Sequence, residues 1–170
     1  DITYGNGLFF VFSYLWKIML SADGITWTAS GLSPPIGDDY WQYVVFENGL
    51  FLATSLKGKV MTSPDGVAWT EGTSLPSIGE TWDQLISGNG LFIVRSGTNG
   101  HMISPDGITW IADTSLPHYS QISYGEAINV ASLGTKGNMI STDGITWTEC
   151  TSLSLPIGPI TYWGCLFVVI

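Results

Sequence analysis

The heptapeptide S-P-D-G-I-T-W at Ser104–Trp110 decides the fold, because the chain contains it in four closely similar copies. The other copies are S-A-D-G-I-T-W at Ser21–Trp27, S-P-D-G-V-A-W at Ser63–Trp69 and S-T-D-G-I-T-W at Ser141–Trp147. Their starting residues, 21, 63, 104 and 141, give a period near 40 residues. A period of this size is typical of repeat proteins, in which each repeat forms one supersecondary unit and neighbouring units share a core.

The Ser-Pro-Asp-Gly part of the motif matches a type I turn position by position, with Ser first, Pro second and Gly last. With a glycine bulge after the turn, Ser63 faces Val67 and Met61 faces Trp69 across an antiparallel hairpin. The same count pairs Met19 with Trp27, Met102 with Trp110 and Met139 with Trp147. A two-residue Asp-Gly turn, which shifts the pairing by one residue, is the alternative.

We interpret the motif as structural and expect its tryptophans to be largely buried. Its aspartates are expected to accept hydrogen bonds within the turn rather than to bind calcium, since they lack the spaced oxygens of an EF-hand loop. The structural positions are Ser21, Asp23, Gly24, Trp27, Ser63, Asp65, Gly66, Trp69, Ser104, Asp106, Gly107, Trp110, Ser141, Asp143, Gly144 and Trp147.

Each repeat opens with a short strand, a turn and an apolar strand, as in Ile2–Tyr4, Asn6-Gly7 and Leu8–Phe12. Asn-Gly between two hydrophobic runs is the strongest short hairpin signal. It recurs in the next two repeats, at Asn48-Gly49 and Asn89-Gly90. Repeat four has Glu126-Ala127 in this place and Asn129 where the others have Phe, so its hairpin is expected to be the least regular.

A second short turn then leads to a third strand, and a fourth strand carries the motif tryptophan. Four strands that alternate in direction make an antiparallel meander, and such meanders stacked around an axis form a β-propeller. A parallel solenoid fits the tight hairpins less well. The sequence therefore predicts an all-β fold, a β-propeller of four-stranded antiparallel blades.

We expect residues 1–170 to form a single propeller domain or propeller segment. Its repeats cover approximately residues 1–40, 41–81, 82–118 and 119–156, and a half repeat covers 157–170. Ile160–Tyr162 and Leu166–Ile170 restate the first half of a repeat. We expect the open edge of this half blade to be covered by further chain or by self-association, since proteins rarely leave such edges exposed.

Composition narrows the class of partner. The chain has 14 acidic and five basic residues, a formal net charge of −9, which argues against nucleic acid and anionic membrane surfaces. No apolar run reaches the length of a membrane-spanning helix, so membrane insertion is not expected. Because the chain begins with Asp1 rather than Met, we interpret it as a processed or excised segment.

The sequence offers few groups for catalysis or metal binding. Cys150 and Cys165 match no metal spacing. A disulfide between them is not expected, because the repeat places them at opposite ends of a strand, roughly 16 Å apart. The two histidines, His101 and His118, do not recur at the repeat spacing and are expected in turns or on the surface. We expect no metal and no cofactor.

The Ser-x-Asp-Gly-x-x-Trp hairpins resemble the Asp-box of BNR-type propellers, found in sialidases and in many non-catalytic secreted propellers. The order N-G-L-F followed by S-x-D-G-x-x-W is more similar to repeats of bacterial surface and phage tail proteins. The resemblance covers nearly the whole chain, although the residue between Asp and Gly in the sialidase Asp-box is missing here. It implies an extracellular, cell-surface or virion location. Sialidase catalysis needs three arginines, and this chain has only Arg95, so no enzyme activity is expected.

In such a meander the Asn-Gly and Asp-Gly turns fall on one face of the propeller, and the second turns and long connections fall on the other. On that other face we predict a ligand-binding surface. Its candidate residues are Tyr14, Trp16, Asp38, Asp39, Tyr40, Trp41, Trp82, Asp83 and Tyr119. Aromatic rings beside carboxylates suit sugars, so we predict a non-catalytic module that binds glycans or a surface partner. Two alternatives stay open: the aromatics pack between blades, or the propeller is purely structural within a larger particle or fibre.

Overall fold

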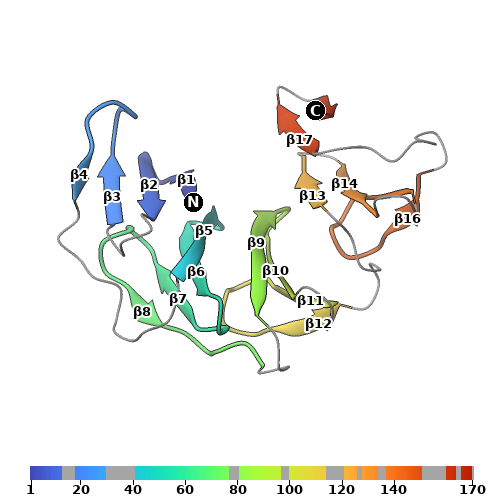
Figure 1. The fold of residues 1–170 in the computed structure, drawn as a ribbon, viewed down its shortest axis with the longest axis horizontal. Coiled ribbons are helices and arrows are strands. Elements are labelled where there is room, and N and C mark those ends of the chain that lie inside the picture. The colour runs from blue at the N-terminus through green and yellow to red at the C-terminus, as the bar shows by residue number, and fades with distance from the viewer. Residues whose placement is uncertain are drawn as a thin grey trace. The chain divides into compact units, whose positions relative to one another are not determined.

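The computed structural model describes residues 1–12, 18–29, 41–76, 81–96, 100–113, 121–125, 128–133, 137–150, 160–163 and 166–169. Every regular element in these ranges is a β-strand (Figure 1). None of the described segments is a helix long and apolar enough to cross a membrane. The chain forms two compact units, Asp1–Ile111 and Ala112–Ile170, which are described in turn.

The first unit contains three antiparallel sheets of four strands, each built from consecutive strands in chain order. The first sheet consists of β1 (Ile2–Gly5), β2 (Leu8–Phe12), β3 (Ile18–Ser21) and β4 (Thr28–Ala29). The second consists of β5 (Trp41–Glu47), β6 (Leu50–Ser55), β7 (Val60–Ser63) and β8 (Thr70–Glu71). The third consists of β9 (Trp82–Gly88), β10 (Leu91–Ser96), β11 (Gly100–Ser104) and β12 (Ile111–Asp113), whose last strand crosses into the second unit.

The second unit contains one four-stranded sheet and one pair of strands. The sheet consists of β13 (Gln121–Tyr124), β14 (Asn129–Ser132), β15 (Asn138–Ser141) and β16 (Thr148–Glu149). The pair consists of β17 (Ile160–Trp163) and β18 (Leu166–Val169). Four meanders and the first half of a fifth are thus present, as the sequence predicted.

The Asn-Gly turns confirm the hairpin prediction. Asn6, Asn48 and Asn89 have φ angles of 51°, 52° and 54°, and each is followed by a glycine that also has positive φ. Asparagine and glycine are the residues that best tolerate this left-handed conformation. In the fourth hairpin Tyr124 pairs with Asn129, as Tyr4 pairs with Phe9 in the first, and the Gly125 N–H donates to the Ile128 carbonyl oxygen at 3.1 Å, so its turn has the same length. Glu126 and Ala127, in that turn, lie outside the described residues.

The pairing predicted around the Ser-x-Asp-Gly motif is wrong. Met61 lies opposite Glu71, and Thr62 lies opposite Thr70, so all seven residues Ser63–Trp69 form a loop. Met19 likewise pairs with Ala29 and Met139 with Glu149, and Trp110 precedes β12 rather than facing Met102. The two-residue turn is excluded by the same registers. The loop stays open because serine and aspartate side chains take up the backbone N–H groups that a tight hairpin would have paired.

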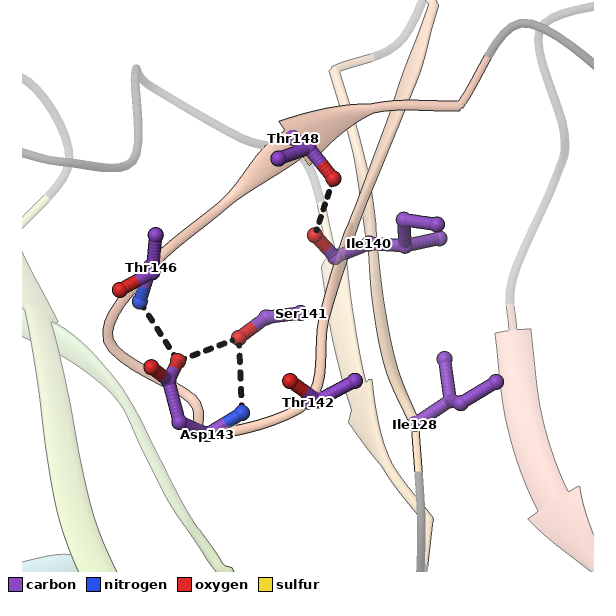
Figure 2. Close-up of a pocket in the computed structure, with 7 residues that line it drawn as sticks. All are labelled: Ile128, Ile140, Ser141, Thr142, Asp143, Thr146 and Thr148. Atoms are coloured by element: carbon purple, nitrogen blue, oxygen red, sulfur yellow. Dashed lines mark hydrogen bonds between the residues drawn. The ribbon is translucent and has the colours of Figure 1, made fainter.

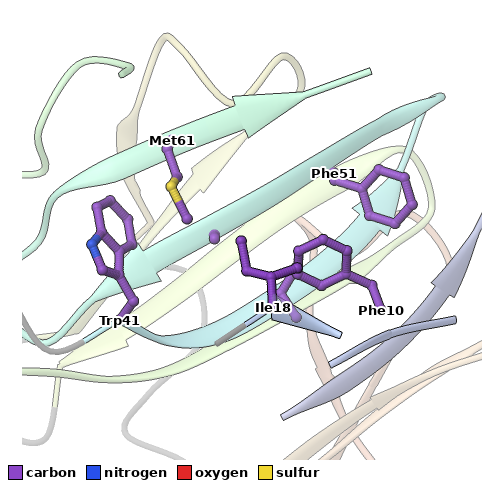
Figure 3. Close-up of a cluster of buried hydrophobic side chains, with 7 residues drawn as sticks. Phe10, Ile18, Trp41, Phe51 and Met61 are labelled. Atoms are coloured by element: carbon purple, nitrogen blue, oxygen red, sulfur yellow. The ribbon is translucent and has the colours of Figure 1, made fainter. Parts of the chain in front are cut away.

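Both faces of the second sheet are buried in the first unit, which explains why its strands are apolar at consecutive positions. One face contributes Phe51, Ala53 and Met61 to a cluster with Phe10 and Ile18 of the first sheet (Figure 3). The opposite face contributes Leu52 and Val60 to a cluster with Phe92 and Val94 of the third sheet. Alternate residues of a strand point to opposite faces, so neighbouring residues of β6 serve different cores.

The motif tryptophans differ in burial. Trp147 is buried, as expected, whereas Trp27, Trp69 and Trp110 are half-buried. The ring of Trp69 lies 5.4 Å from that of Phe10 in the preceding repeat. The motif tryptophan of repeat two therefore packs against its neighbouring repeat at the edge of the core.

Candidate functional site

The motif loop is held by its own serine and aspartate side chains. In repeat two, the Ser63 hydroxyl donates to Asp65 Oδ1 at 3.0 Å and accepts the Gly66 N–H at 2.8 Å. Asp65 Oδ1 also accepts the N–H groups of Val67 and Ala68, each at 2.8 Å. The other three loops contain the same bonds. This confirms that the four aspartates act as acceptors within the loop.

These hydrogen bonds keep the four aspartates ionised. The N–H groups three and two residues ahead are the largest causes, and they lower the pKa of Asp23 and Asp106 to about 2. The pKa values of Asp65 and Asp143 are lowered by the same donors. Each loop therefore carries a negative charge near neutral pH.

An exposed apolar side chain follows the glycine of every motif. Ile25, Val67, Ile108 and Ile145 occupy this position and are 84%, 45%, 56% and 45% exposed. We call these four residues the loop-tip residues. Sequence reasoning missed them, because the predicted turn paired Val67 with Ser63 inside a hairpin. The available signal was a β-branched apolar residue at the same position of all four loops.

A small pocket lies beside the motif loop in repeats one and four. In repeat four its volume is about 310 Å³, and in repeat one about 350 Å³. Figure 2 shows the pocket of repeat four, which Ile128, Ile140 and Thr148 line together with Ser141, Thr142, Asp143 and Thr146 of the motif loop. The linings match by repeat position: Ile128, Ile140, Ser141, Thr142, Asp143, Thr146 and Thr148 correspond to Leu8, Leu20, Ser21, Ala22, Asp23, Thr26 and Thr28. Each pocket offers an apolar wall beside hydroxyl groups and a carboxylate.

Hydrogen bonds from the Asn-Gly turns reach the next motif loop. Asn48 Nδ2 donates to the carbonyl oxygens of Gly90 at 2.8 Å and Pro105 at 3.1 Å. Asn6 Nδ2 similarly donates to the carbonyl oxygen of Pro64 at 3.5 Å. The Asn-Gly turns and motif loops of the first unit therefore lie at the same end of their sheets, as the meander predicted.

Only part of the predicted ligand-binding surface falls in the described residues. Tyr14, Trp16, Asp38, Asp39, Tyr40 and Tyr119 lie outside them. Trp41 and Trp82 are buried, with 8% and 3% exposure, so the expectation that they form an exposed platform is wrong. For these two rings, the alternative of packing between repeats holds.

The surroundings of Trp82 show why it is buried. Its backbone N–H donates to the carbonyl oxygen of Leu56, at the second turn of the preceding repeat, at 3.0 Å. A Cβ atom on Gly58 in that turn would lie 2.8 Å from Trp82 Nε1. The indole ring therefore packs directly against the turn of repeat two, where glycine leaves the necessary space.

Asp83 remains accessible and forms an ion pair. It is the extra residue of a β-bulge, because Trp82 pairs with Ser96 and Gln84 with Arg95. Arg95 Nε donates to Asp83 Oδ1 at 3.2 Å, and 37% of the Asp83 side chain is exposed. Tyr43 donates its hydroxyl to the Asp83 carbonyl oxygen at 2.5 Å, and burial raises the pKa of this tyrosine. Bulges often redirect a side chain in this way.

The prediction that His101 lies in a turn or on the surface is wrong. The histidine is 4% exposed, in β11 opposite Arg95. The same register position holds Ile18, Val60 and Asn138 in the other repeats, and all three are buried. His118 and Cys165 lie outside the described residues, so the predictions about them stay untested. The described residues contain no group of three or more side chains suited to a metal ion.

Comparison with solved structures identifies the fold. No family model matches the chain, and no curated protein matches it. A YCF48 structure with a bound D1 peptide matches with a TM-score of 0.68 and 15% identity, covering 96% of this chain and 58% of that one. A streptogramin B lyase matches at 0.70 with 12% identity, covering 100% and 61%. Virginiamycin B lyase from Staphylococcus aureus matches at 0.69 with 15% identity, covering 96% and 59%.

The chain has a β-propeller fold. Each four-stranded sheet is one blade, so the described residues include four blades and two strands of a fifth. The chain spans about three fifths of the length of the three similar proteins, from 58% to 61%. At 12% to 15% identity, these similarities establish the fold alone.

Proposed function

We propose that this propeller is a non-catalytic binding module that recognises a protein segment through the loop-tip residues of its first unit, Ile25, Val67 and Ile108. The observation that carries the proposal is the exposure of these three side chains at one motif position. Exposed apolar residues on one surface often mark interaction sites, and the motif loops of the first unit lie at the same end of their sheets. Because the loop backbone is fixed by four hydrogen bonds, these side chains lose little conformational freedom on binding.

The charge around the loop tips sets the expected chemistry of the partner. Each loop-tip residue lies two positions after an ionised aspartate, and the chain carries a formal net charge of −9. A segment that combines apolar side chains with Lys or Arg complements this surface. The YCF48 structure with a bound D1 peptide supports a peptide partner as the kind of ligand that this fold accepts.

The glycan hypothesis has less support among the described residues, since Trp41 and Trp82 are buried. Asp83 is the candidate that remains accessible on that surface. The resemblance to the Asp-box repeats of surface and phage tail proteins supports an extracellular, cell-surface or virion location. It is also compatible with the second candidate, a structural propeller that assembles with other chains of a particle or fibre.

A binding screen tests the proposal. The chain is applied to a peptide array that alternates apolar residues with Lys, to the same peptides with Glu in place of Lys, and to a glycan array. We expect binding to the Lys peptides, with at least a tenfold loss in the triple variant Ile25→Ser, Val67→Ser, Ile108→Ser. A matched control, Ile2→Ser with Ile111→Ser, alters side chains that are each 59% exposed outside the motif loops. Binding to glycans alone, or equal loss in the control, would contradict the proposal.

A further inference from the structure

Repeat four departs from the others at a buried position. Asn129 has no exposed surface and replaces the phenylalanine that the other repeats have as Phe9, Phe51 and Phe92. In all four repeats this residue lies opposite the motif serine, which in repeat four is Ser141. A side-chain amide therefore occupies a site that is built for an aromatic ring.

The amide of Asn129 has no hydrogen-bond partner among the described residues, on either its oxygen or its nitrogen. Ser141, the residue opposite, cannot supply one. Its hydroxyl already donates to Asp143 Oδ1 at 2.9 Å and accepts the N–H groups of Gly144 at 2.8 Å and Asp143 at 3.2 Å. One donor and two acceptor positions are all that a hydroxyl has. Leaving a buried polar group unsatisfied costs about 1–3 kcal/mol.

The motif tryptophan of the same repeat also lacks a hydrogen-bond partner among the described residues. Trp147 is 8% exposed, and its indole N–H has no partner among the described residues. In repeat two, by contrast, Trp69 Nε1 donates to the carbonyl oxygen of Gly66 at 3.1 Å. In repeat one the centres of the Phe9 and Trp27 rings lie 6.4 Å apart. A Cβ atom on Gly24 would lie 3.3 Å from Phe9 Cε2, so the phenylalanine ring packs against this glycine. By register, Asn129 takes the place of that ring beside Gly144 and Trp147.

The smaller side chain leaves room. Asparagine has three fewer side-chain heavy atoms than phenylalanine, which corresponds to one or two water molecules at roughly 30 Å³ each. Asn129 supplies an acceptor and a donor, and Trp147 supplies a second donor. Buried waters typically form about three hydrogen bonds, with a range of two to four, and two waters bonded to each other and to these three groups form three and two.

We propose that repeat four contains an internal water-binding site formed by the Asn129 side-chain amide and the Trp147 indole N–H. One water accepts from Trp147 Nε1 and donates to Asn129 Oδ1, and a second accepts from Asn129 Nδ2. Repeat three provides the contrast. Trp110 Nε1 is also buried without a partner among the described residues, but the position of Asn129 is there filled by Phe92, which offers no polar group.

Nuclear magnetic resonance of the whole chain with ¹⁵N-labelled tryptophan tests this site. The indole signals of Trp147 and Trp110 are assigned with Trp147→Phe and Trp110→Phe. We expect a cross-peak between the Trp147 indole proton and long-lived water, absent for Trp110 in the same spectrum. The cross-peak should disappear in Asn129→Phe, which restores the residue of the other repeats. Asn129→Leu serves the same purpose if the phenylalanine variant does not fold.

A crystal structure of the unaltered chain gives an independent readout. We expect solvent density within hydrogen-bonding distance of Asn129 Oδ1 and Trp147 Nε1. Empty density there overturns the proposal, as does an equal water cross-peak for Trp110 or a Trp147 cross-peak that persists in both Asn129 variants.

Discussion

In each motif loop, hydrogen bonds to the aspartate carboxylate replace the backbone pairing of a hairpin. One carboxylate oxygen receives three donors in each loop, which include two consecutive backbone N–H groups. Serine completes the arrangement by closing onto the glycine N–H. This is why a loop of seven residues, too long for a tight hairpin, has the same geometry in all four repeats. It also explains why the loop tip can present an apolar side chain to solvent.

Acid should weaken the fold through these aspartates. A depressed carboxyl pKa contributes stability that is present above the unfolded pKa and lost as pH falls through the folded pKa. For Asp23 and Asp106 the ordinary value is 3.8 and the folded value is about 2, so the loss should occur between about pH 4 and pH 2. Urea unfolding midpoints measured across this range should fall with pH. In Asp106→Asn the slope should be smaller, and an unchanged slope would contradict the assignment.

The motif tryptophans should differ in their contribution to stability. Trp147→Ala removes a buried ring and should cost about 3–5 kcal/mol. Trp69→Ala removes a half-buried ring, so it should lower the free energy of unfolding by less, about 2 kcal/mol. Denaturant melts of the two variants provide the comparison. A larger loss for Trp69 than for Trp147 would show that burial does not govern the difference.

Residue-level reasoning from the sequence succeeded where one residue decides the conformation. Asn48-Gly49 requires positive φ at both positions, and both have it. It failed where side chains compete with the backbone. The expected pairing of Met61 with Trp69 counted backbone geometry alone and left out the Ser63 and Asp65 acceptors. His101 is buried because it occupies the same register position as Val60, and the residues next to His101 in the sequence do not reveal this.

At the scale of the elements, side-chain hydrogen bonds join the Asn-Gly hairpins of repeats one and two to the next repeat. Asn48 donates to two carbonyl oxygens of repeat three, whereas no side-chain hydrogen bond of Asn89 is found within the described ranges. Both residues have nearly the same φ, 52° and 54°. Among the described residues, the two turns therefore form a matched pair that differs in the two hydrogen bonds of Asn48.

This pair gives a direct measurement of the link. Asn48→Gly keeps a residue suited to positive φ but removes both hydrogen bonds, so it should destabilise the chain by about 1–2 kcal/mol relative to Asn89→Gly. Thermal or urea unfolding of the two variants measures the difference. Equal stabilities would mean that the bonds of Asn48 to Gly90 and Pro105 contribute nothing in solution.

The strands were predictable at this scale because their pattern is repeated. Continuous apolar runs such as those of β6 and β10 are typical of strands buried on both faces, and the neighbouring residues Leu52 and Ala53, like Phe92 and Ile93, are all buried. The expectation that the fourth hairpin is the least regular stays a prediction, because Glu126 and Ala127 lie outside the described residues. The sequence did not decide whether Trp41 and Trp82 are buried or exposed, because an aromatic residue at the start of a strand suits both a binding face and a contact between blades.

At the scale of the whole molecule, the pair β17–β18 differs from the other sheets. The second strand of every four-stranded sheet pairs on both sides, whereas β18 pairs with β17 alone among the described strands. An open strand edge readily accepts another strand. We therefore expect the 170-residue chain to self-associate in solution.

Light scattering measures this directly, since a monomer has a mass of 18.4 kDa. Proline lacks the N–H that pairs strands, and neighbouring residues direct their N–H groups to opposite edges. One of Phe167→Pro and Val168→Pro should therefore block the outer edge of β18 and restore the monomer mass. A monomer of the unaltered chain at all concentrations would contradict the expectation.

The short range of the bonds inside each motif loop has a consequence for how the chain reaches its folded state. The hydrogen bonds that the motif serine and aspartate make within a loop join residues no more than three positions apart, and the ladders of the described strands join neighbours within one repeat. Contacts between residues close in the sequence form without closing long loops, so this pairing can precede the contacts between repeats. During synthesis, a blade can therefore complete its own pairing soon after about 40 residues have emerged, before the next repeat is made.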